Sequence, residues 1–399
     1  MARKFKVLLT THRSRLHSGS TLQLFLLAEE LLKRGHRVYA LFKGDRGQGP
    51  HPSLQPLQDA GVKLDLVKFT IMKYRHTVPE LWWLYRYLLR EQFDVVNTFG
   101  GTDLSHLMIS GSGIFIPALI AYRGLAEPLD PFNSIKYRLP KVRKIIANSE
   151  AVKKIMMRTG RIPSEKIAVI YGGFDEARFR PEISGAGVRK ELGIEDSAAV
   201  VLIIAHLKFV LDDRKGGYYF LQAAEKVLEQ RPDTRFLLVG KVDRENFAKL
   251  ASERLKPACI ITGFRNDIPE LLAASNLLVN SSLSEGMAGV LREALAMARP
   301  AVATEIDGTP ELVRPGETGL LVPPKNPEAL ARAILQLLNN RAEAQRMGAR
   351  GRQLVLELCR NESRVDRYEQ IYCEEYERAT AKPHSWLHRQ YWARKKSEP

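Results

Sequence analysis

Residues 5–42 read FKVLLTTHRSRLHSGSTLQLFLLAEELLKRGHRVYALF, which is the pattern of a strand, a helix and a second strand. The apolar run at 5–10 is typical of a buried strand, and leucines and alanines recur at helical spacing from 21 to 34. Gly35 then stands where a C′ glycine often ends a helix, and 37–42 form the second apolar run. A strand–helix–strand unit of this kind pairs its strands in parallel. We therefore expect a parallel sheet that is covered by helices.

The same alternation continues along the rest of the chain. In the first half we expect further strands at 94–98, 118–122, 144–148 and 166–171, with helices at 80–91 and 150–159. In the second half we expect strands at 200–205, 235–239, 259–262, 277–280, 300–304 and 319–322, with helices at 217–230, 269–274, 286–297, 327–339 and 342–358. The pattern predicts an α/β protein with two successive Rossmann-like, doubly wound domains.

Composition places the domain boundaries. We predict a first domain at 1–175, a linker at 176–195, a second domain at 196–360, and a C-terminal helix with a basic tail at 361–399. The linker is rich in Arg, Glu, Gly and Pro, which interrupt regular structure.

General composition narrows the class of protein. The chain has 399 residues, of which 45% are hydrophobic and 27% charged, as in ordinary globular proteins. No apolar run approaches the 18 residues of a membrane-spanning helix, and the N-terminus lacks a signal peptide pattern. Three cysteines are too few for a disulfide framework and fit no zinc pattern. We expect a cytoplasmic protein.

The positive charge is concentrated in the first half of the chain. Residues 1–175 hold 27 Lys/Arg and 14 Asp/Glu, a net of +13, whereas residues 176–378 hold 29 and 30, a net of −1. Residues 379–399 add 5 basic and 1 acidic residue. One basic half indicates an acidic partner, such as nucleic acid, anionic lipid or a phosphorylated substrate. Solubility alone is the plainer alternative.

The most informative motif is Ser284-Glu285-Gly286-Met287-Ala288-Gly289-Val290-Leu291-Arg292-Glu293. A buried strand is expected just before it, and a helix begins inside it. A helix N-terminus offers unpaired N–H groups and partial positive charge to an oxygen-rich ligand. Glu285 and Glu293 would lie roughly 12 Å apart along the helix axis, which is too far for a hydrolase pair acting on one bond. They are better placed to contact two ends of one long ligand.

This motif and several others, in order along the chain, resemble the large retaining glycosyltransferase family four, also called glycosyltransferase group 1, which has the GT-B fold. Glu285 and Glu293 match its E-x7-E signature. The other matching runs are 162–175 with Phe179-Arg180-Pro181, Arg214-Lys215-Gly216, Thr262-Gly263-Phe264, Ile268-Pro269-Glu270-Leu271-Leu272, Gly308-Thr309-Pro310-Glu311-Leu312-Val313 and 316–324. The resemblance covers nearly all of 160–355, whereas the first half matches only in general layout and in its glycine loop.

The resemblance implies two Rossmann-like domains that face each other across a cleft, with a nucleotide-sugar donor lying mostly against the second. Glu293 would hold the ribose hydroxyls and Glu285 the transferred sugar. Arg214 and Lys215 would stabilise the negative charge that develops on the leaving diphosphate. The remaining implied donor contacts are Gly19, His206, Gly263, Phe264, Arg265, Met287, Ala288, Gly289 and Val290.

Two positions depart from the family pattern. Gly-Arg-Leu is common at the end of the first strand of the second domain, but here the sequence is Ala205-His206-Leu207, and histidine is not a permanent cation. His-Gly is common near the transferred sugar, but here the strand ends in Arg123-Gly124. Arg123 therefore suggests an acceptor or donor with extra negative charge. His106 is a second candidate on the acceptor side, and a structural role for it is an equal alternative.

We expect a retaining, metal-independent glycosyltransferase with no cofactor. Its expected donor is a UDP-, GDP- or ADP-sugar. The expected acceptor is a lipid-linked or cell-envelope saccharide, as in lipopolysaccharide or exopolysaccharide synthesis. A sugar-nucleotide epimerase or hydrolase on the same fold is the alternative. A nucleic-acid-binding protein is a weaker one, because no helix-turn-helix, zinc or RNP pattern accompanies the basic charge.

Three segments suggest association with an anionic membrane surface. Residues 68–92 alternate basic side chains with large aromatic and aliphatic ones, residues 136–154 form a second basic run, and the tail carries Trp386, Tyr391 and Trp392 among basic residues. Such mixtures suit a lipid headgroup layer. The alternative for 82–89 is that these side chains form only the core face of a helix.

Overall fold

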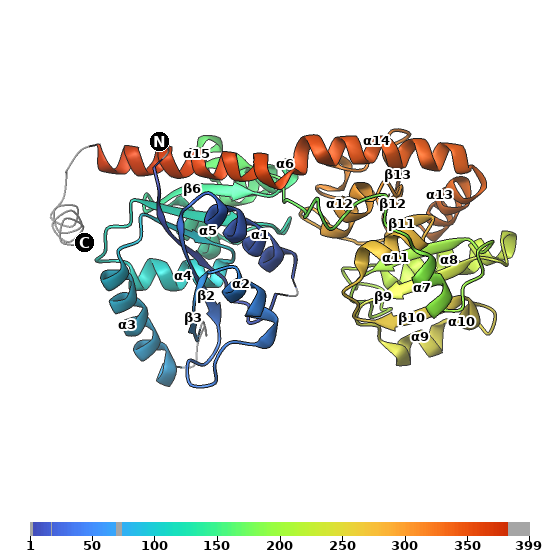
Figure 1. Ribbon diagram of the computed structural model, residues 1–399, viewed down its shortest axis with the longest axis horizontal. Helices are drawn as coiled ribbons and strands as arrows, with labels where there is room; N and C mark the ends of the chain where they lie inside the picture. Colours follow the sequence, from blue (N-terminus) through green and yellow to red (C-terminus); the bar gives the residue numbers. More distant parts are fainter. Residues whose placement is uncertain (1–2, 17, 69–73, 382–399) are drawn as a thin grey trace. The chain divides into compact units, whose positions relative to one another are not determined.

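The computed structural model describes residues 3–16, 18–68 and 74–381. The chain forms two compact units (Figure 1). Unit 1 comprises Met1–Gly173 together with Asn361–Pro399, and unit 2 comprises Phe174–Arg360. The C-terminal segment therefore returns to the first unit.

Unit 1 contains a parallel sheet, for which the described residues give seven strands in the order β3-β2-β1-β4-β5-β6-β7. The central strand β1 is buried along its whole length and pairs with β2 on one side and β4 on the other. The strands are β1 (Lys6–Thr10), β2 (Arg37–Lys43), β3 (Lys63–Val67), β4 (Val95–Thr98), β5 (Ala118–Arg123), β6 (Val142–Ala147) and β7 (Ile167–Val169).

Helices cover both faces of this sheet. Alternate residues of β1 serve the two faces, since Val7 and Leu9 join one hydrophobic cluster and Leu8 joins the other. One cluster includes side chains of α1, α2 and α15, and the other includes side chains of α3 to α6. The helices are α1 (Gly19–Lys33), η1 (Pro52–Leu54), α2 (Gln55–Asp59), α3 (Tyr74–Glu91), α4 (Gly101–Ser110), α5 (Pro131–Arg138), α6 (Glu150–Gly160), η2 (Ser164–Lys166) and α15 (Asn361–Thr380).

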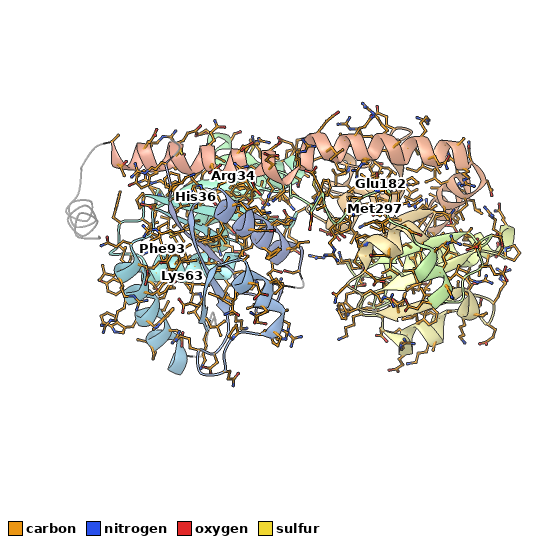
Figure 2. The ribbon with its side chains drawn as sticks, viewed as in Figure 1. Arg34, His36, Lys63, Phe93, Glu182 and Met297 are labelled. Atoms are coloured by element: carbon orange, nitrogen blue, oxygen red, sulfur yellow. The ribbon has the colours of Figure 1, made fainter. Side chains whose placement is uncertain are left out.

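The last helix, α15, is fastened to unit 1 by an aromatic stripe and by charge pairs. Tyr368, Tyr372 and Tyr376 recur every four residues and are fully buried against the sheet. Arg34 and His36, which Figure 2 labels, bind the carboxylate of Glu369 beside this stripe. These contacts explain why the end of the chain belongs to the first unit.

Unit 2 contains a second parallel sheet, in the order β10-β9-β8-β11-β12-β13 among the described residues. Its strands are β8 (Val200–Ile204), β9 (Arg235–Val239), β10 (Cys259–Gly263), β11 (Leu277–Asn280), β12 (Ala301–Thr304) and β13 (Gly319–Val322). Its helices are α7 (Ala186–Glu191), α8 (Gly217–Gln230), α9 (Arg244–Leu250), α10 (Leu255–Ala258), α11 (Ile268–Ala274), α12 (Gly289–Ala296), η3 (Thr309–Glu311), α13 (Pro327–Asn339) and α14 (Arg341–Cys359). A single large cluster joins β8, β9 and β11 to α8 and α13.

The expected fold class of two doubly wound α/β domains is confirmed by these two sheets. The segment expected as a linker, 176–195, contains the short helix α7. Helices α4 and α5 in unit 1 lie outside the predicted elements. Within the described ranges, no helix is both long and apolar enough to span a membrane.

Candidate functional site

The carboxyl ends of β8 and β11 bring the two most informative motifs of unit 2 together. Lys215 lies in the loop between β8 and α8, and Glu285 lies in the loop between β11 and α12. Their side chains form an ion pair, although the residues are 70 apart in sequence. A cation and a carboxylate therefore share the edge of the sheet where ligands of doubly wound folds bind.

Gly216 holds the Lys215 loop against the next strand. Its φ of +64° is a left-handed conformation that favours glycine. A Cβ at this position would lie 1.9 Å from the carbonyl oxygen of Ser281, so no larger residue fits. The Ser281 hydroxyl donates to the Lys215 carbonyl oxygen (3.1 Å), and the Leu283 N–H donates to that of Arg214 (2.7 Å). The backbone on both sides of the ion pair is thereby fixed.

Glu285 is held by groups besides Lys215. Its Oε1 accepts a hydrogen bond from the Ser282 hydroxyl (3.0 Å), and its N–H donates to Oδ2 of Asp307 (2.9 Å). Asp307 has a φ of +39°, which is unusual for a residue other than glycine. Sequence reasoning missed Asp307, which directly precedes the matched run at Gly308 and positions the Glu285 backbone.

Glu293 lies on α12 and differs from Glu285 in having no partner. It is partly buried, and its carboxylate forms no hydrogen bond or ion pair with any described residue. Burial raises the pKa of Glu293, and the charges of Arg292 and Arg178 oppose that rise. Arg178 was not among the predicted residues. A carboxylate with a raised pKa at the ligand-binding edge of such a sheet is a candidate for ligand binding.

The start of α12 leaves backbone donors free beside this carboxylate. Ala288 is the N-cap and has no side chain that could accept a hydrogen bond from the first turn. In the described structure, the N–H groups of Met287, Ala288, Gly289 and Val290 donate to no protein acceptor. Because the helix dipole adds partial positive charge here, this turn can receive phosphate or hydroxyl oxygens.

The end of β10 supplies the next predicted residues. Gly263 has a φ of +76° and its carbonyl oxygen accepts from the Gly240 N–H. Phe264 is 78% exposed, so its ring is available to stack on a planar group. The Arg265 guanidinium, in contrast, is occupied by the carboxylates of Glu191 and Asp267. These acids hold the pKa of Arg265 above its ordinary value.

His206 and Arg214 lie at the same edge of the sheet and are exposed. His206 follows β8 and forms no hydrogen bond with a described residue. Apart from Gly19, which belongs to unit 1, the donor-side residues predicted from sequence thus lie near the carboxyl ends of β8, β10 and β11. Their roles stay predictions.

The predicted residues of unit 1 are more dispersed. Gly19 begins α1 behind the N-cap Ser18, and a Cβ there would meet nothing within 4 Å. His106 is buried on α4, and its Nδ1 lies 2.9 Å from the Thr102 carbonyl oxygen, as in many structural histidines. Arg123 ends β5 and donates to the Glu127 carbonyl oxygen (2.6 Å).

A polar cluster in unit 1 escaped the sequence reasoning. The buried carboxylate of Asp103 accepts from the Thr10 hydroxyl (2.8 Å) and lies 3.4 Å from Nδ1 of His12. Burial raises the pKa of Asp103, and its contacts with His12 and Thr10 oppose that rise. A Cβ on Gly100 would lie 2.2 Å from the His12 ring, which explains this glycine. The adjacent glycines at 100 and 101 were the only signal in the sequence.

No group of three or more His, Cys, Asp or Glu side chains that could hold a metal ion occurs in the described part of the chain. The adjacent acids Asp212 and Asp213 do not form such a group, and Asp212 faces Lys325 at 3.3 Å. Metal independence stays a prediction.

Family models match both halves of the chain. A model described as glycosyltransferase family 4 matches residues 17–178, and one described as glycosyl transferases group 1 matches residues 198–340. The N-acetyl-alpha-D-glucosaminyl L-malate synthase of Bacillus anthracis is 28% identical over 295 residues, which cover 73% of this chain and 70% of that protein.

A second curated relative is the UDP-Gal:alpha-D-GlcNAc-diphosphoundecaprenol alpha-1,3-galactosyltransferase of Escherichia coli. It is 26% identical over 273 residues, or 65% of this chain and 70% of the relative. Among solved structures, a glycosyltransferase from Rickettsia africae ESF-5 superposes with a TM-score of 0.80 at 19% identity, covering 94% of this chain and 99% of that one. At this identity the structural likeness shows the fold alone.

Proposed function

Because the chain belongs to the glycosyltransferases of family 4 (group 1) and is a glycosyltransferase, we propose that it uses a nucleotide-sugar donor and retains the anomeric configuration. One observation carries the proposal. The unpaired carboxylate of Glu293 stands beside the uncapped start of α12, at the sheet edge where Lys215 and Glu285 meet. A ligand with both hydroxyl donors and anionic oxygens would satisfy all of these groups.

In this proposal, the donor binds along the carboxyl edge of the sheet in unit 2. Glu293 accepts hydrogen bonds from the ribose hydroxyls, and the N–H groups from Met287 to Val290 receive diphosphate or sugar oxygens. Phe264 offers an exposed aromatic face for the base. Glu285 contacts the transferred sugar. The base itself stays open among uracil, guanine and adenine, and the E. coli relative is named for a UDP-sugar.

The reaction breaks the bond between the anomeric carbon and the diphosphate, and the electron pair stays on the diphosphate oxygen. The acceptor hydroxyl oxygen bonds to that carbon, and its proton passes to the departing diphosphate oxygen. Because negative charge grows on the diphosphate in the transition state, Lys215 and Arg214 lower the barrier. The Glu285 contact keeps Lys215 in place before the donor arrives.

The acceptor proposed is a lipid-linked or cell-envelope saccharide. The E. coli relative is named for a diphosphoundecaprenol-linked acceptor. The B. anthracis relative is named for L-malate, so small acids form the competing class of acceptor.

Exposed apolar side chains in unit 1 support a membrane surface as partner. On α3, Leu84 and Leu88 point into the core, whereas Trp82 is 59% exposed on the outer face beside the exposed Arg86. On α5, Phe132 is 86% exposed and Ile135 is also exposed. Core packing therefore accounts for one face of α3, and the exposed face is the one that we propose contacts the membrane. Residues 69–73 and the tail with Trp386, Tyr391 and Trp392 lie outside the described residues.

The test measures release of nucleoside diphosphate from UDP-, GDP- and ADP-sugars. Each donor is supplied alone, with a lipid-linked saccharide extract, and with L-malate, and each mixture is repeated with EDTA. We expect rapid release from one donor only when the lipid extract is present, and no effect of EDTA. Equal release without an acceptor would favour the hydrolase alternative. Proton NMR of the product then reports whether the anomeric configuration is retained.

A further inference from the structure

A polar pocket lies in unit 2, at the opposite edge of the sheet from Lys215 and Glu285. Its volume is about 540 Å³, and its wall includes Ala199, Asn276 and Pro300, which directly precede β8, β11 and β12. Because these strands are parallel, their first residues share one edge. The family motifs do not reach this pocket, and nothing in the proposed reaction uses it.

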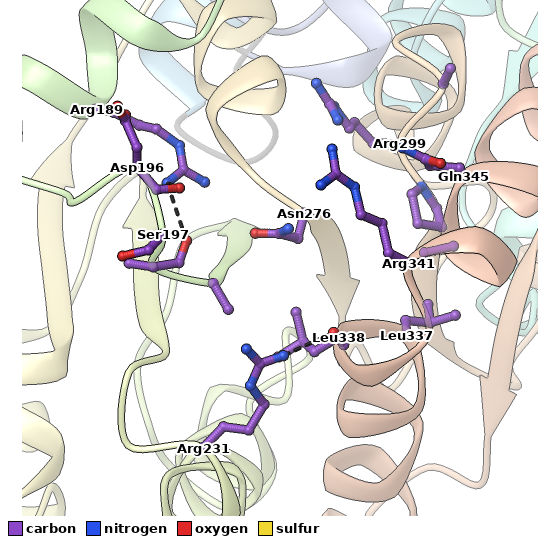
Figure 3. A pocket seen from close by; sticks show the side chains of 15 residues that line it. Arg189, Asp196, Ser197, Arg231, Asn276, Arg299, Leu337, Leu338, Arg341 and Gln345 are labelled. Carbon is purple, nitrogen blue, oxygen red and sulfur yellow. Dashed lines mark hydrogen bonds between the residues drawn. The ribbon is translucent and has the colours of Figure 1, made fainter.

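Four arginines line this pocket against a single acid, Asp196. They are Arg189, Arg231, Arg299 and Arg341, and we call the site the arginine pocket. Figure 3 shows Arg231, Arg299 and Arg341 extending from different elements toward the space around Asn276. The wall therefore carries an excess of three positive charges. Among the described residues, a carboxylate lies within ion-pair distance of Arg231 alone of the four, and it is that of Asp233 (3.2 Å).

Two of these arginines are partly buried and have no carboxylate of a described residue within ion-pair distance, although the charge of Asp196 stabilises that of Arg189. Arg189 donates to the carbonyl oxygens of Ala274 (3.0 Å) and Ala198 (3.1 Å), and it thereby connects two backbone segments. Arg299 donates to the Ala273 carbonyl oxygen (3.0 Å), and its buried Nε has no partner among the described residues. Burial lowers the pKa of both groups, and the charge of Arg189 lowers that of Arg299 further. Backbone carbonyl oxygens offset part of the desolvation of these two charges, and a bound anion would offset more of it.

Arg341 is available to bind a ligand. It begins α14, and its exposed side chain makes no hydrogen bond or ion pair with a described residue. Asn276 uses its Oδ1 to accept from the Val200 N–H (2.7 Å), which leaves its amide N–H groups as donors. Leu337 and Leu338 form an apolar part of the same wall.

We propose that the arginine pocket binds a small organic phosphate with at least two negative charges. The pairing of Asp233 with Arg231 leaves an excess of two positive charges, and one phosphate group with about −1.5 to −2 charges at neutral pH balances it. Guanidinium groups bind phosphate oxygens bidentately, and the leucines accommodate the organic part. The volume falls within the roughly 300–1,000 Å³ typical of small-molecule sites. Because the pocket lies at the other edge of the sheet, its ligand does not compete with the donor.

The test uses inorganic pyrophosphate as the probe. Titration calorimetry measures its binding, and hydrogen exchange locates the residues that it protects. Pyrophosphate also resembles part of the donor and can bind at the donor site. The residues whose exchange slows therefore show which of the two sites it occupies. We expect slowed exchange at residues 196–199 and 341–345, in addition to any change at residues 285–293. Arg341→Gln and Arg299→Gln should each weaken this second binding at least tenfold. Arg346→Gln, on the exposed face of the same helix and outside the pocket wall, is the matched control and should leave it unchanged.

Several results would overturn the proposal. One is the absence of protection at 196–199 and 341–345, and another is protection that Arg341→Gln and Arg299→Gln both retain. Citrate at equal ionic strength separates phosphate from carboxylate ligands, and equal binding of citrate would refute the phosphate assignment. Lys215→Ala distinguishes the two sites, because it should weaken only the binding at 285–293. Failure of the donor assignment would therefore leave the arginine pocket testable.

Discussion

At the scale of single residues, Glu293 shows a conflict between stability and binding. Its partly buried carboxylate has a raised pKa, so the folded state disfavours the charged form relative to the unfolded chain. The contribution of this group to stability therefore declines as the pH rises from the ordinary glutamate pKa through the raised one. A residue retained under such a penalty is expected to bind something.

We predict that Glu293→Gln stabilises the protein at pH 7, because the amide has no charge to desolvate. The gain should shrink as the pH falls toward the ordinary pKa of glutamate, where both states of the wild type become protonated. Urea unfolding across this range measures the difference. Glu245→Gln, whose side chain is 79% exposed, is the control and should change nothing. A gain that is independent of pH would mean that charge is not its cause.

Lys215 provides the second prediction at this scale. Lys215→Ala should lower kcat more than donor affinity, because the charge that it stabilises develops mainly in the transition state. Steady-state kinetics at saturating donor measure the split. Lys226→Ala removes an exposed lysine of α8 that pairs with Glu328, and it should leave both constants unchanged. Near-wild-type turnover of Lys215→Ala would exclude the assigned role.

Two glycines separate a structural from a ligand-related requirement. Gly216→Ala should destabilise unit 2 by about 2 kcal/mol or more, through its left-handed conformation and the clash with Ser281. Gly19→Ala meets no protein atom, so it should leave the melting temperature unchanged or slightly raised while it lowers kcat/KM. Gly187→Ala, also in open space, is the control for activity. Full activity of Gly19→Ala would remove this residue from the ligand contacts.

At the scale of elements, the long periodic helices could be predicted from sequence, whereas the exact start of α12 and the short helices could not. The bounds of α8 and α13 agree with the predicted 217–230 and 327–339. The expected helix at 286–297 begins only at Gly289, because Ala288 stays extended, and this late start is what exposes the N–H groups. Short helices such as α4 gave too weak a periodicity to predict.

Contacts between distant segments explain the rest of what sequence could not foresee. Arg265 pairs with Glu191, which is 74 residues away in sequence, and no local sequence pattern predicts this contact. The same holds for His12 with Asp103 in unit 1. The contact between Lys215 and Glu285 was not predicted either, although both residues were assigned to the donor site because they belong to motifs of a recognised family.

The outer face of α3 provides the prediction at this scale. Trp82→Gln combined with Arg86→Gln should reduce pelleting with anionic vesicles, because one change removes an interfacial anchor and the other about 1 kcal/mol of attraction. Leu250→Gln changes an exposed apolar residue of unit 2 and should have no effect. Wild-type protein should ignore neutral vesicles and leave anionic ones at about 0.5 M salt. Equal binding to both vesicle types, or to neither, would contradict this surface.

At the scale of the whole molecule, charge and chemistry are divided between the units. The excess of basic residues belongs to residues 1–175 and to the tail, whereas 176–378 are nearly neutral. Unit 2 holds the candidate donor residues at one edge of its sheet and the arginine pocket at the other. This division fits the proposed function, in which unit 1 contacts an anionic surface and unit 2 binds the donor.

The central claim is that Glu293 receives the ribose of a nucleotide-sugar donor, and calorimetric titration of UDP, GDP and ADP tests it most directly. Wild-type protein should bind one of the three at a single donor site. Glu293→Ala should weaken that binding by about 1.5–3 kcal/mol, the usual loss for hydrogen bonds to a charged group, while Glu245→Ala leaves it unchanged. Equal affinity of Glu293→Ala and wild type for the bound nucleotide, or no binding of any of the three by wild type, would contradict the account.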